Sequence, residues 1–456
     1  MKFFSKFLFT VIPVLQATAG ELCPLPEPFD AHAVYARIFY VSPNGSDASG
    51  TGAREQPFHT LQRAVQEARP GTQIILREGR HVSGAFISNL RGEPGSPILI
   101  SGAPGEGPAV FRGGTEAIHL SDPRYVVLQN LTVEAASGNG VNIDDAGTFE
   151  TPAEYVILRS LTVRNIGPFG NRDGIKLSGL DHFRVENCTI SRPGDGGSAI
   201  DMVGCHDGIL AHNRFADLPE TGIQAKGGSA RLLIFGNYFE SGGTRALNLG
   251  GSTGMQFFRP QDATFEAAHI TAWANVIVDA ESPVAFVGSE NCLFAHNTVY
   301  RPRKWAARIL QENNHPRLVK SRNNVYANNI VVVDGSVTTF VNVGPNTFPN
   351  TFIFENNFWF HLADPSFRGP NLPTREAGSI IQQDPLFLDA GKGDFHLQEG
   401  SPAIGVAGDL AEIINGLPID LPAVGDCEEQ CWGIPASVGA YAGLGATGLE
   451  GWRSMH

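Results

Sequence analysis

Residues 221–254 read TGIQAKGGSARLLIFGNYFESGGTRALNLGGSTG and contain one short pattern twice. Each copy has a small residue, alternating apolar and polar positions and a closing glycine. The pattern occurs five times in the chain: GNGVNIDDAG (138–147), RDGIKLSG (172–179), GSAIDMVG (197–204), TGIQAKGG (221–228) and TRALNLGG (244–251). Equivalent positions in the last four copies are 25, 23 and 24 residues apart: Gly174, Ala199, Gly222 and Ala246. The chain therefore repeats about every 24 residues.

Alternating apolar and polar residues indicate short β-strands. A parallel series of apolar runs carries asparagines at matching places: Asn187, Asn213, Asn237, Asn297 and Asn329. Coils of this length can bury their apolar faces only by stacking, and stacked amides can hydrogen-bond one another. The sequence therefore predicts an all-β, single-domain right-handed parallel β-helix. A β-propeller is disfavoured, because it needs blades of about forty residues with aromatic signatures that this chain lacks.

The ends of the chain differ from the repeats. Residues 1–19 carry two lysines, an apolar run and an A-x-A site, which predicts a signal peptide and export to the extracellular or periplasmic space. Residues 20–456 then form the β-helix domain, with the catalytic coils at about 138–260. A short helix from Leu61 to Ala68 is expected to cap the first coil. Long insertions are expected around 254–272 and 361–383.

Composition limits the possible partners and the roles of the cysteines. A net charge of −13 argues against a nucleic-acid binder, and no segment of the mature chain is apolar enough for a membrane span. We expect a monomer. Cys427 and Cys431 are close enough for a local disulfide, whereas three other cysteines lie in apolar runs and are expected to be buried: Cys188, Cys205 and Cys292.

Lys226 and Arg245 are nineteen residues apart. With a repeat near 24, they lie on neighbouring coils, about 4.8 Å apart along the axis and roughly five strand positions apart sideways. A bend at the glycines would bring them to about one sugar unit from each other. The alternative is that both side chains are solvated or are paired with Glu240 or Asp201.

One register position of the repeat is polar on five coils: Asn142, Lys176, Asp201, Gln224 and Asn248. We expect this column to face outward and to suit a linear, anionic glycan. Residues 159–259 contain eleven basic and nine acidic residues, a local charge of +2 in an acidic chain, which also favours an anionic substrate. A simple ion pair between Lys176 and Asp201 is the alternative.

Three aspartates form the most plausible metal site: Asp173, Asp195 and Asp201. Carboxylates are the ligands that Ca²⁺ prefers, and a bound Ca²⁺ would hold a uronate carboxylate. Aspartates that only form turns are the alternative.

The stretch QAKGGSARLLIFGNYFESGGTRALNLGG resembles the catalytic rungs of family 6 polysaccharide lyases, which include alginate lyases and chondroitinase B. The phrases differ in detail, because Lys226 is followed by Gly-Gly-Ser and Arg245 by Ala-Leu-Asn. The resemblance implies β-elimination on a uronate polymer, with Lys226 as base and Arg245 as acid or carboxylate clamp. The polar column would then bind substrate through Lys176, Gln224, Asn248 and Asn142.

Three other functions fit the same predicted fold. An inverting glycosidase would use paired carboxylates, such as Asp173 with Asp195 or Asp201. A C5-epimerase is chemically close, but its Asp-Pro-His-Asp phrase is missing. A non-catalytic glycan-binding solenoid would be favoured if the 254–272 insertion sealed the polar column.

Overall fold

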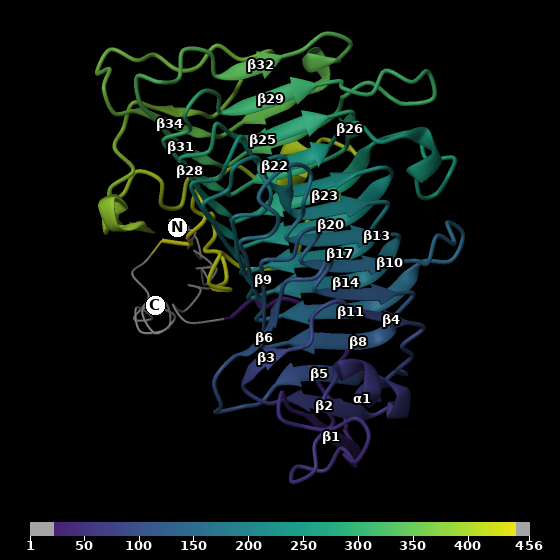
Figure 1. The fold of residues 1–456 in the computed structure, drawn as a ribbon. Helices are drawn as coiled ribbons and strands as arrows, with labels where there is room; N and C mark the ends of the chain where they lie inside the picture. Colours follow the sequence, from purple (N-terminus) through teal and green to yellow (C-terminus); the bar gives the residue numbers. More distant parts are fainter. Residues whose placement is uncertain (1–21, 444–456) are drawn as a thin grey trace, which may run out of the picture.

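The computed structural model describes residues 22–443. Its strands stack as successive coils along one axis, from β1 at one end to β32 at the other (Figure 1). The three long sheets are parallel, and a typical coil, such as β14, β15 and β16, contributes one strand to each sheet. The chain is an all-β, right-handed parallel β-helix, which confirms the predicted fold class. The predicted signal peptide, residues 1–19, lies outside the described residues.

Sheet I has thirteen strands: β1 (Arg37–Val41), β2 (Thr72–Leu76), β5 (Ile98–Gly102), β8 (Arg124–Gln129), β11 (Ala153–Arg159), β14 (Leu180–Glu186), β17 (His206–Ala211), β20 (Ser229–Phe235), β23 (Ala267–Trp273), β26 (Ser289–Glu290), β27 (Leu293–Ala295), β30 (Val325–Ala327) and β33 (Ile353–Glu355). Sheet II has ten: β4 (Ala85–Ser88), β7 (Ile118–Ser121), β10 (Val141–Asp144), β13 (Ile175–Ser178), β16 (Ser198–Val203), β19 (Thr221–Lys226), β22 (Arg245–Gly250), β25 (Ser282–Val287), β29 (Ala307–Leu310) and β32 (Val341–Val343).

Sheet III has twelve strands: β3 (Gly79–His81), β6 (Ala109–Arg112), β9 (Leu131–Glu134), β12 (Thr162–Arg164), β15 (Thr189–Ser191), β18 (Arg214–Ala216), β21 (Tyr238–Glu240), β24 (Val276–Val278), β28 (Thr298–Tyr300), β31 (Ile330–Val333), β34 (Phe358–His361) and β35 (Ile380–Ile381). An antiparallel hairpin follows: β36 (Phe387–Asp389) and β37 (Asp394–Leu397). The helices are short: α1 (Leu61–Glu67), α2 (Leu410–Ile413), η1 (Met255–Phe257), η2 (Pro349–Thr351) and η3 (Ala390–Lys392).

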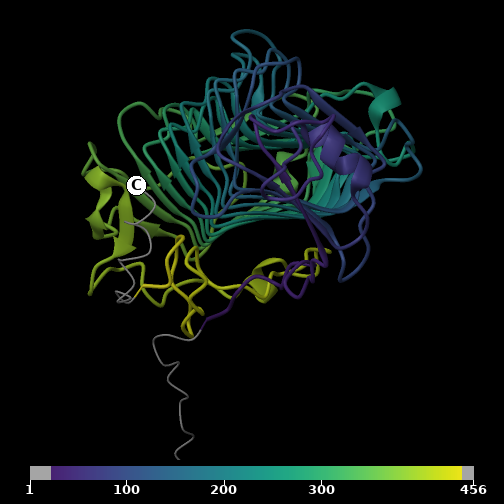
Figure 2. The ribbon, with the colours of Figure 1, turned by 60° about the horizontal axis from the view of Figure 1, so that its bottom comes forward.

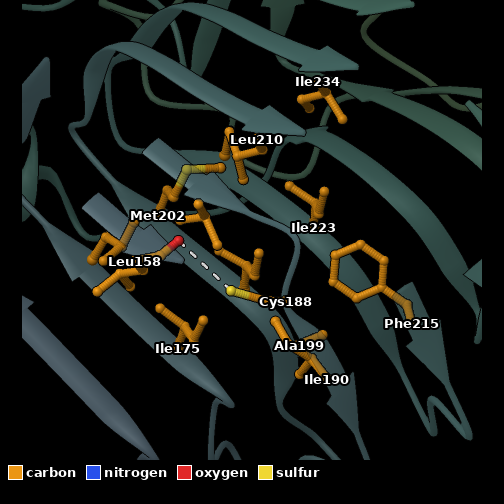
Figure 3. Close-up of a cluster of buried hydrophobic side chains, with 14 of the residues drawn as sticks. Leu158, Ile175, Cys188, Ile190, Ala199, Met202, Leu210, Phe215, Ile223 and Ile234 are labelled. Atoms are coloured by element: carbon orange, nitrogen blue, oxygen red, sulfur yellow. Dashed lines mark hydrogen bonds between the residues drawn. The ribbon is translucent and has the colours of Figure 1, made fainter. Parts of the chain in front are cut away.

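The core fills the inside of the coils with stacked apolar side chains (Figure 3). Ile175, Ile200 and Ile223 occupy one register position on three successive strands of sheet II, and all three are fully buried. Cys188, Cys205 and Cys292 are also buried and free, as predicted. Because each coil buries its apolar face only against its neighbours, the core is continuous along the axis.

A ladder of buried asparagines joins the coils between sheets I and III. In each step, the side-chain oxygen of one asparagine accepts two hydrogen bonds from the asparagine on the preceding coil, one from its backbone amide and one from its side-chain amide. The members are Asn213, Asn237, Asn275, Asn297, Asn329 and Asn357. The prediction for Asn187 is wrong by one position, because Cys188 holds that place and donates its backbone amide to Asn213.

Helix α1 begins after Thr60, whose hydroxyl accepts from the Arg63 amide, and it packs at the first coils as the predicted cap. Figure 2 shows the last part of the chain running along the outside of the solenoid beside the N-terminal segment. The two segments are joined by a disulfide between Cys23 and Cys431. The predicted disulfide between Cys427 and Cys431 is therefore wrong, and Cys427 is a buried free thiol. Among residues 22–443, no helix has the length and apolarity needed to cross a membrane.

Candidate functional site

The polar column lies on the outer face of sheet II. Its ladder partners are in register on five successive strands, as the repeat predicts: Asn142, Lys176, Asp201, Gln224 and Asn248. The residues on either side of each member, such as Ile175 and Leu177, belong to the apolar core. Because side chains alternate along a strand, the column must face outward. The column is partly covered: the Lys176 side chain is 20% exposed, whereas Asp201 and Asn248 are each 1% exposed.

Asp201 lies between two lysines on neighbouring coils. The Nζ of Lys176 donates a short hydrogen bond to Oδ2 of Asp201, and the Nζ of Lys226 lies 3.1 Å from Oδ1. Burial raises the pKa of Asp201, but the two ammonium groups outweigh burial and hold this pKa below its ordinary value. The ion pair considered for Lys176 and Asp201 is thus present, and it includes Lys226. A buried carboxylate is tolerated here because it is paired twice.

Asp173 lies two residues before β13, and its carboxylate faces Lys176. Its Oδ1 accepts from the backbone amide of Ser198 at 2.8 Å, and its Oδ2 lies 3.7 Å from the Nζ of Lys176. Burial, together with the nearby charge of Asp201, raises the pKa of Asp173 to about 6. For Lys176, burial lowers the pKa, but the two carboxylates reverse this and raise it overall. Lys176 therefore stays protonated between two acids of different strength.

The three predicted calcium ligands do not come together. Asp195 accepts a hydrogen bond from the backbone amide of Gly170, and no three acidic, His or Cys side chains within residues 22–443 form a possible metal site. Asp173 and Asp201 face lysine ammonium groups, which compete with a cation. Among the described residues, the three predicted ligands therefore do not form one metal site.

Lys226 and Arg245 lie at opposite ends of adjacent strands. Arg245 pairs with Thr221 at the start of β19, whereas Lys226 ends that strand. The two residues are five strand positions apart, so their Cα atoms are roughly 16 Å apart sideways. The long side chain of Arg245 shortens this gap, because its Nη1 donates to Oδ1 of Asn248 at 3.1 Å.

The contacts of Arg245 and Lys226 extend the polar surface. The Nη2 of Arg245 donates to Glu312 at 2.7 Å, and the Nζ of Lys226 donates to Oε1 of Gln224 at 3.4 Å. Since Gln224 and Asn248 are ladder partners, one band of polar groups joins Arg245 to Lys226 and Asp201. Glu240, the other partner considered, pairs with Arg214 instead. The band therefore presents two separate cationic side chains, Lys226 and Arg245, to a polymer that lies along the axis of the solenoid.

The insertion after β22 forms a wall beside this band. Within it, Arg259 reaches back over several coils, and its guanidinium pairs with the buried Asp145 after β10. A Cβ at Gly179 or Gly204 would lie within 2.6 Å of Arg259 atoms. Both glycines also have φ near +60°. The closing glycines of the repeats thus leave room for the insertion.

Two groups on the outer face of sheet II were not predicted. His119, in register with Asn142, lies 2.8 Å from Glu116 and 2.6 Å from Asp144. Burial lowers the pKa of His119, but the two carboxylates outweigh it and raise the pKa to about 9. Arg308 occupies the same register position toward the other end of the sheet. Both residues stand at the polar position of an alternating run, IHLS (118–121) and ARIL (307–310), so the sequence pattern could have predicted that they face outward. Their distance from Lys226 in the sequence kept them from being assigned to the same site.

The first comparison is with protein families and curated proteins. A family model described as "Right handed beta helix region" matches residues 116–261 and 149–359, which together cover more than half of the chain. The uncharacterized protein YwoF of Bacillus subtilis (strain 168) is 27% identical over 135 residues. That stretch is 28% of this chain and 28% of YwoF, so the chain spans little more than a quarter of that relative.

Solved structures resemble the whole solenoid at low identity. Pectate lyase Pel9A has a TM-score of 0.56 and 13% identity, covering 90% of this chain and 98% of its own. The complex of XylC with xylose has a TM-score of 0.54 and 11% identity, with coverages of 89% and 98%. The GH136 lacto-N-biosidase from Eubacterium ramulus has a TM-score of 0.51 and 13% identity, with coverages of 76% and 68%. These likenesses establish the fold.

Proposed function

The chain belongs to the right-handed β-helix family, and on this premise we propose that it is a secreted, monomeric enzyme that cleaves a uronate-containing polysaccharide by β-elimination. The carrying observation is that Lys226 and Arg245 lie on one band of polar side chains on the outer face of sheet II, each beside a carboxylate that holds it in place. The surrounding stretch, residues 159–259, has a local charge of +2 in a chain of net charge −13, which favours an anionic polymer. The resemblance of the Lys226 and Arg245 phrases to family 6 lyases supports the reaction type, and the Cys23–Cys431 disulfide supports an oxidising compartment.

Lys226 is the proposed base. It must be neutral to take the proton from C5, and Asp201 then keeps Lys176 as its counter-ion, so no buried carboxylate is left unpaired. The electron pair of the C5–H bond forms the C4–C5 double bond, and the C4–O bond breaks. The lysine ammonium formed in the first step is the nearest donor for the leaving oxygen.

Arg245 is the proposed carboxylate clamp. Its guanidinium is held by hydrogen bonds to Asn248 and Glu312. Its strand, β22, lies one coil beyond the strand of Lys226. A planar fork of donors suits a carboxylate, and binding it acidifies the neighbouring C–H bond. Gln224, Asn248, Asn142 and Lys176 would then line the path of the substrate.

The direct test is incubation with polygalacturonate, alginate and chondroitin sulfate while near-ultraviolet absorbance is followed, because elimination creates an unsaturated sugar. Lys226→Ala should lower the rate about 10²- to 10⁴-fold. Lys226→Arg should not restore it, because a guanidinium stays protonated. Lyase activity in Lys226→Ala within about threefold of wild type would reject the assignment of the base.

A glycoside hydrolase is the second candidate, favoured by one observation. Asp173 and Asp201 are neighbouring carboxyl groups whose pKa values are shifted in opposite directions, as a general acid and its ionised partner require. A hydrolase would release new reducing ends without unsaturation. It would also lose activity in Asp173→Asn and keep most of it in Lys226→Ala.

A further inference from the structure

Arg308 is a half-buried cation in β29, in register with Ala285 and Asn342. Its Nε donates to Oδ1 of Asn342 at 3.1 Å, and its guanidinium carbon lies 4.4 Å from the centre of the Trp305 ring. Within residues 22–443, no carboxylate lies within 4.0 Å of the Arg308 guanidinium. The side chain is therefore held in place by neutral groups while its charge has no direct partner.

The carboxylates nearest to Arg308 are already used by other cations. Glu312 accepts from Arg245 at 2.7 Å, and Glu281 lies 3.5 Å from the Nζ of Lys304. Burial lowers the pKa of Arg308, and repulsion by Arg245 lowers it further, while these two carboxylates oppose the change. In this group of three cations and two carboxylates, one positive charge is left over, and Arg308 is the cation that has no carboxylate partner among the described residues.

Arg245 and Arg308 come from strands two ladder steps apart. Between them, β25 places Ala285 in the polar column, so only a methyl group separates their coils at this register. Arg245 leans toward the column through its contact with Asn248. The Arg308 guanidinium, held by Asn342 and Trp305 and without a carboxylate partner of its own in the described part of the chain, forms a site to which a glycan carboxylate would be attracted.

We propose that Arg308 forms a second carboxylate-binding subsite, which takes a uronate unit farther along the same glycan than the unit held by Lys226 and Arg245. The strands of Lys226 and Arg308 are three ladder steps apart, roughly 14 Å along the axis. The substrate is therefore a polymer that carries uronate carboxylates at short intervals, and not a neutral polymer with isolated uronates. This inference rests on the proposed function, because it assumes that the glycan lies along sheet II.

Binding is measured by calorimetry with hexamers of galacturonate and mannuronate, each beside its carboxyl-reduced counterpart. Lys226→Ala serves as the parent protein, so that the hexamers are not cleaved. Arg308→Gln in this parent should weaken binding of the better charged hexamer about 10- to 100-fold, the usual value of a charge-assisted hydrogen bond. Binding of the reduced hexamer should change less than twofold, and Arg308→Lys should retain part of the affinity.

Arg231→Gln is the matched control, because Arg231 pairs with Asp207 on the outer face of sheet I. It should leave the affinity for both hexamers unchanged. Affinity of Arg308→Gln for the charged hexamers within twofold of its parent would overturn the inference, as would a parent that binds charged and reduced hexamers equally. Failure of the proposed function looks different: the wild-type protein would form no unsaturated product, while the loss of affinity in Arg308→Gln would persist.

Discussion

Asp201→Asn tests whether the buried carboxylate holds the two lysines of the polar column together. Asp201 is 1% exposed and contacts both Lys176 and Lys226, so the substitution leaves two ammonium groups without their shared counter-ion. Removing one partner of a buried ion pair costs about 3–5 kcal/mol. Unfolding of the roughly 420 described residues has an entropy of about 0.9 kcal/mol/K, so the melting temperature should fall by about 3–6 °C at pH 7.

The assay is thermal unfolding followed by circular dichroism at pH 7 and pH 3. The pKa of Asp201 is lowered on folding, so its stabilisation is present above the ordinary value of 3.8 and is lost as the pH falls through the folded-state pKa. The difference between variant and wild type should therefore shrink at pH 3. Asp207→Asn, which breaks the surface pair with Arg231, should shift melting by about 1 °C or less. An Asp201→Asn variant that melts within 1 °C of wild type at pH 7 would refute the reasoning.

Three further predictions concern other parts of the fold. Asn297→Ala removes a fully buried member of the asparagine ladder and leaves the two amide donors of Asn275 unpaired. It should lower the free energy of unfolding by about 2–4 kcal/mol in a denaturant titration, and a loss below about 0.5 kcal/mol would contradict the ladder's role. The pKa of Asp173 is raised to about 6 on folding, so this group destabilises the folded protein as the pH rises from about 4 to 6. Asp173→Asn should therefore gain stability relative to wild type over that pH range, and parallel profiles of melting temperature against pH would count against the raised pKa. Peptide mapping without reduction should recover Cys23 joined to Cys431, and a peptide joining Cys427 to Cys431 would show this pairing to be wrong.

The fold could be predicted from the sequence because the repeat is visible within short stretches of the chain. A period of about 24 residues with alternating apolar positions places each polar side chain on a known face, so the register of Asn142, Lys176 and Asp201 could be predicted. The asparagine ladder was predictable in kind but was misplaced at Asn187, because a cysteine occupies the ladder position in that coil. Spacing alone cannot show which of two adjacent polar residues points inward.

The candidate site was predictable only where its residues lie on neighbouring coils. Arg308 and Glu312 are more than sixty residues from Arg245 in sequence and reach it because the solenoid brings their coils together. The Cys23–Cys431 pairing joins residues 408 positions apart, so the nearby Cys427 seemed the better partner. Asp195 illustrates the opposite error: it is close to Asp201 in sequence, but its carboxylate accepts a hydrogen bond from the Gly170 amide instead of joining Asp201 in one site.

The central claim is that a polyuronate is cleaved by elimination on the outer face of sheet II. The most direct measurement is mass spectrometry of the products formed from a defined uronate hexamer by the wild-type protein. Elimination predicts two fragments whose masses sum to that of the hexamer, one of them unsaturated, and no such fragments from Lys226→Ala. Fragments whose masses sum to the hexamer plus one water would show hydrolysis and contradict the claim.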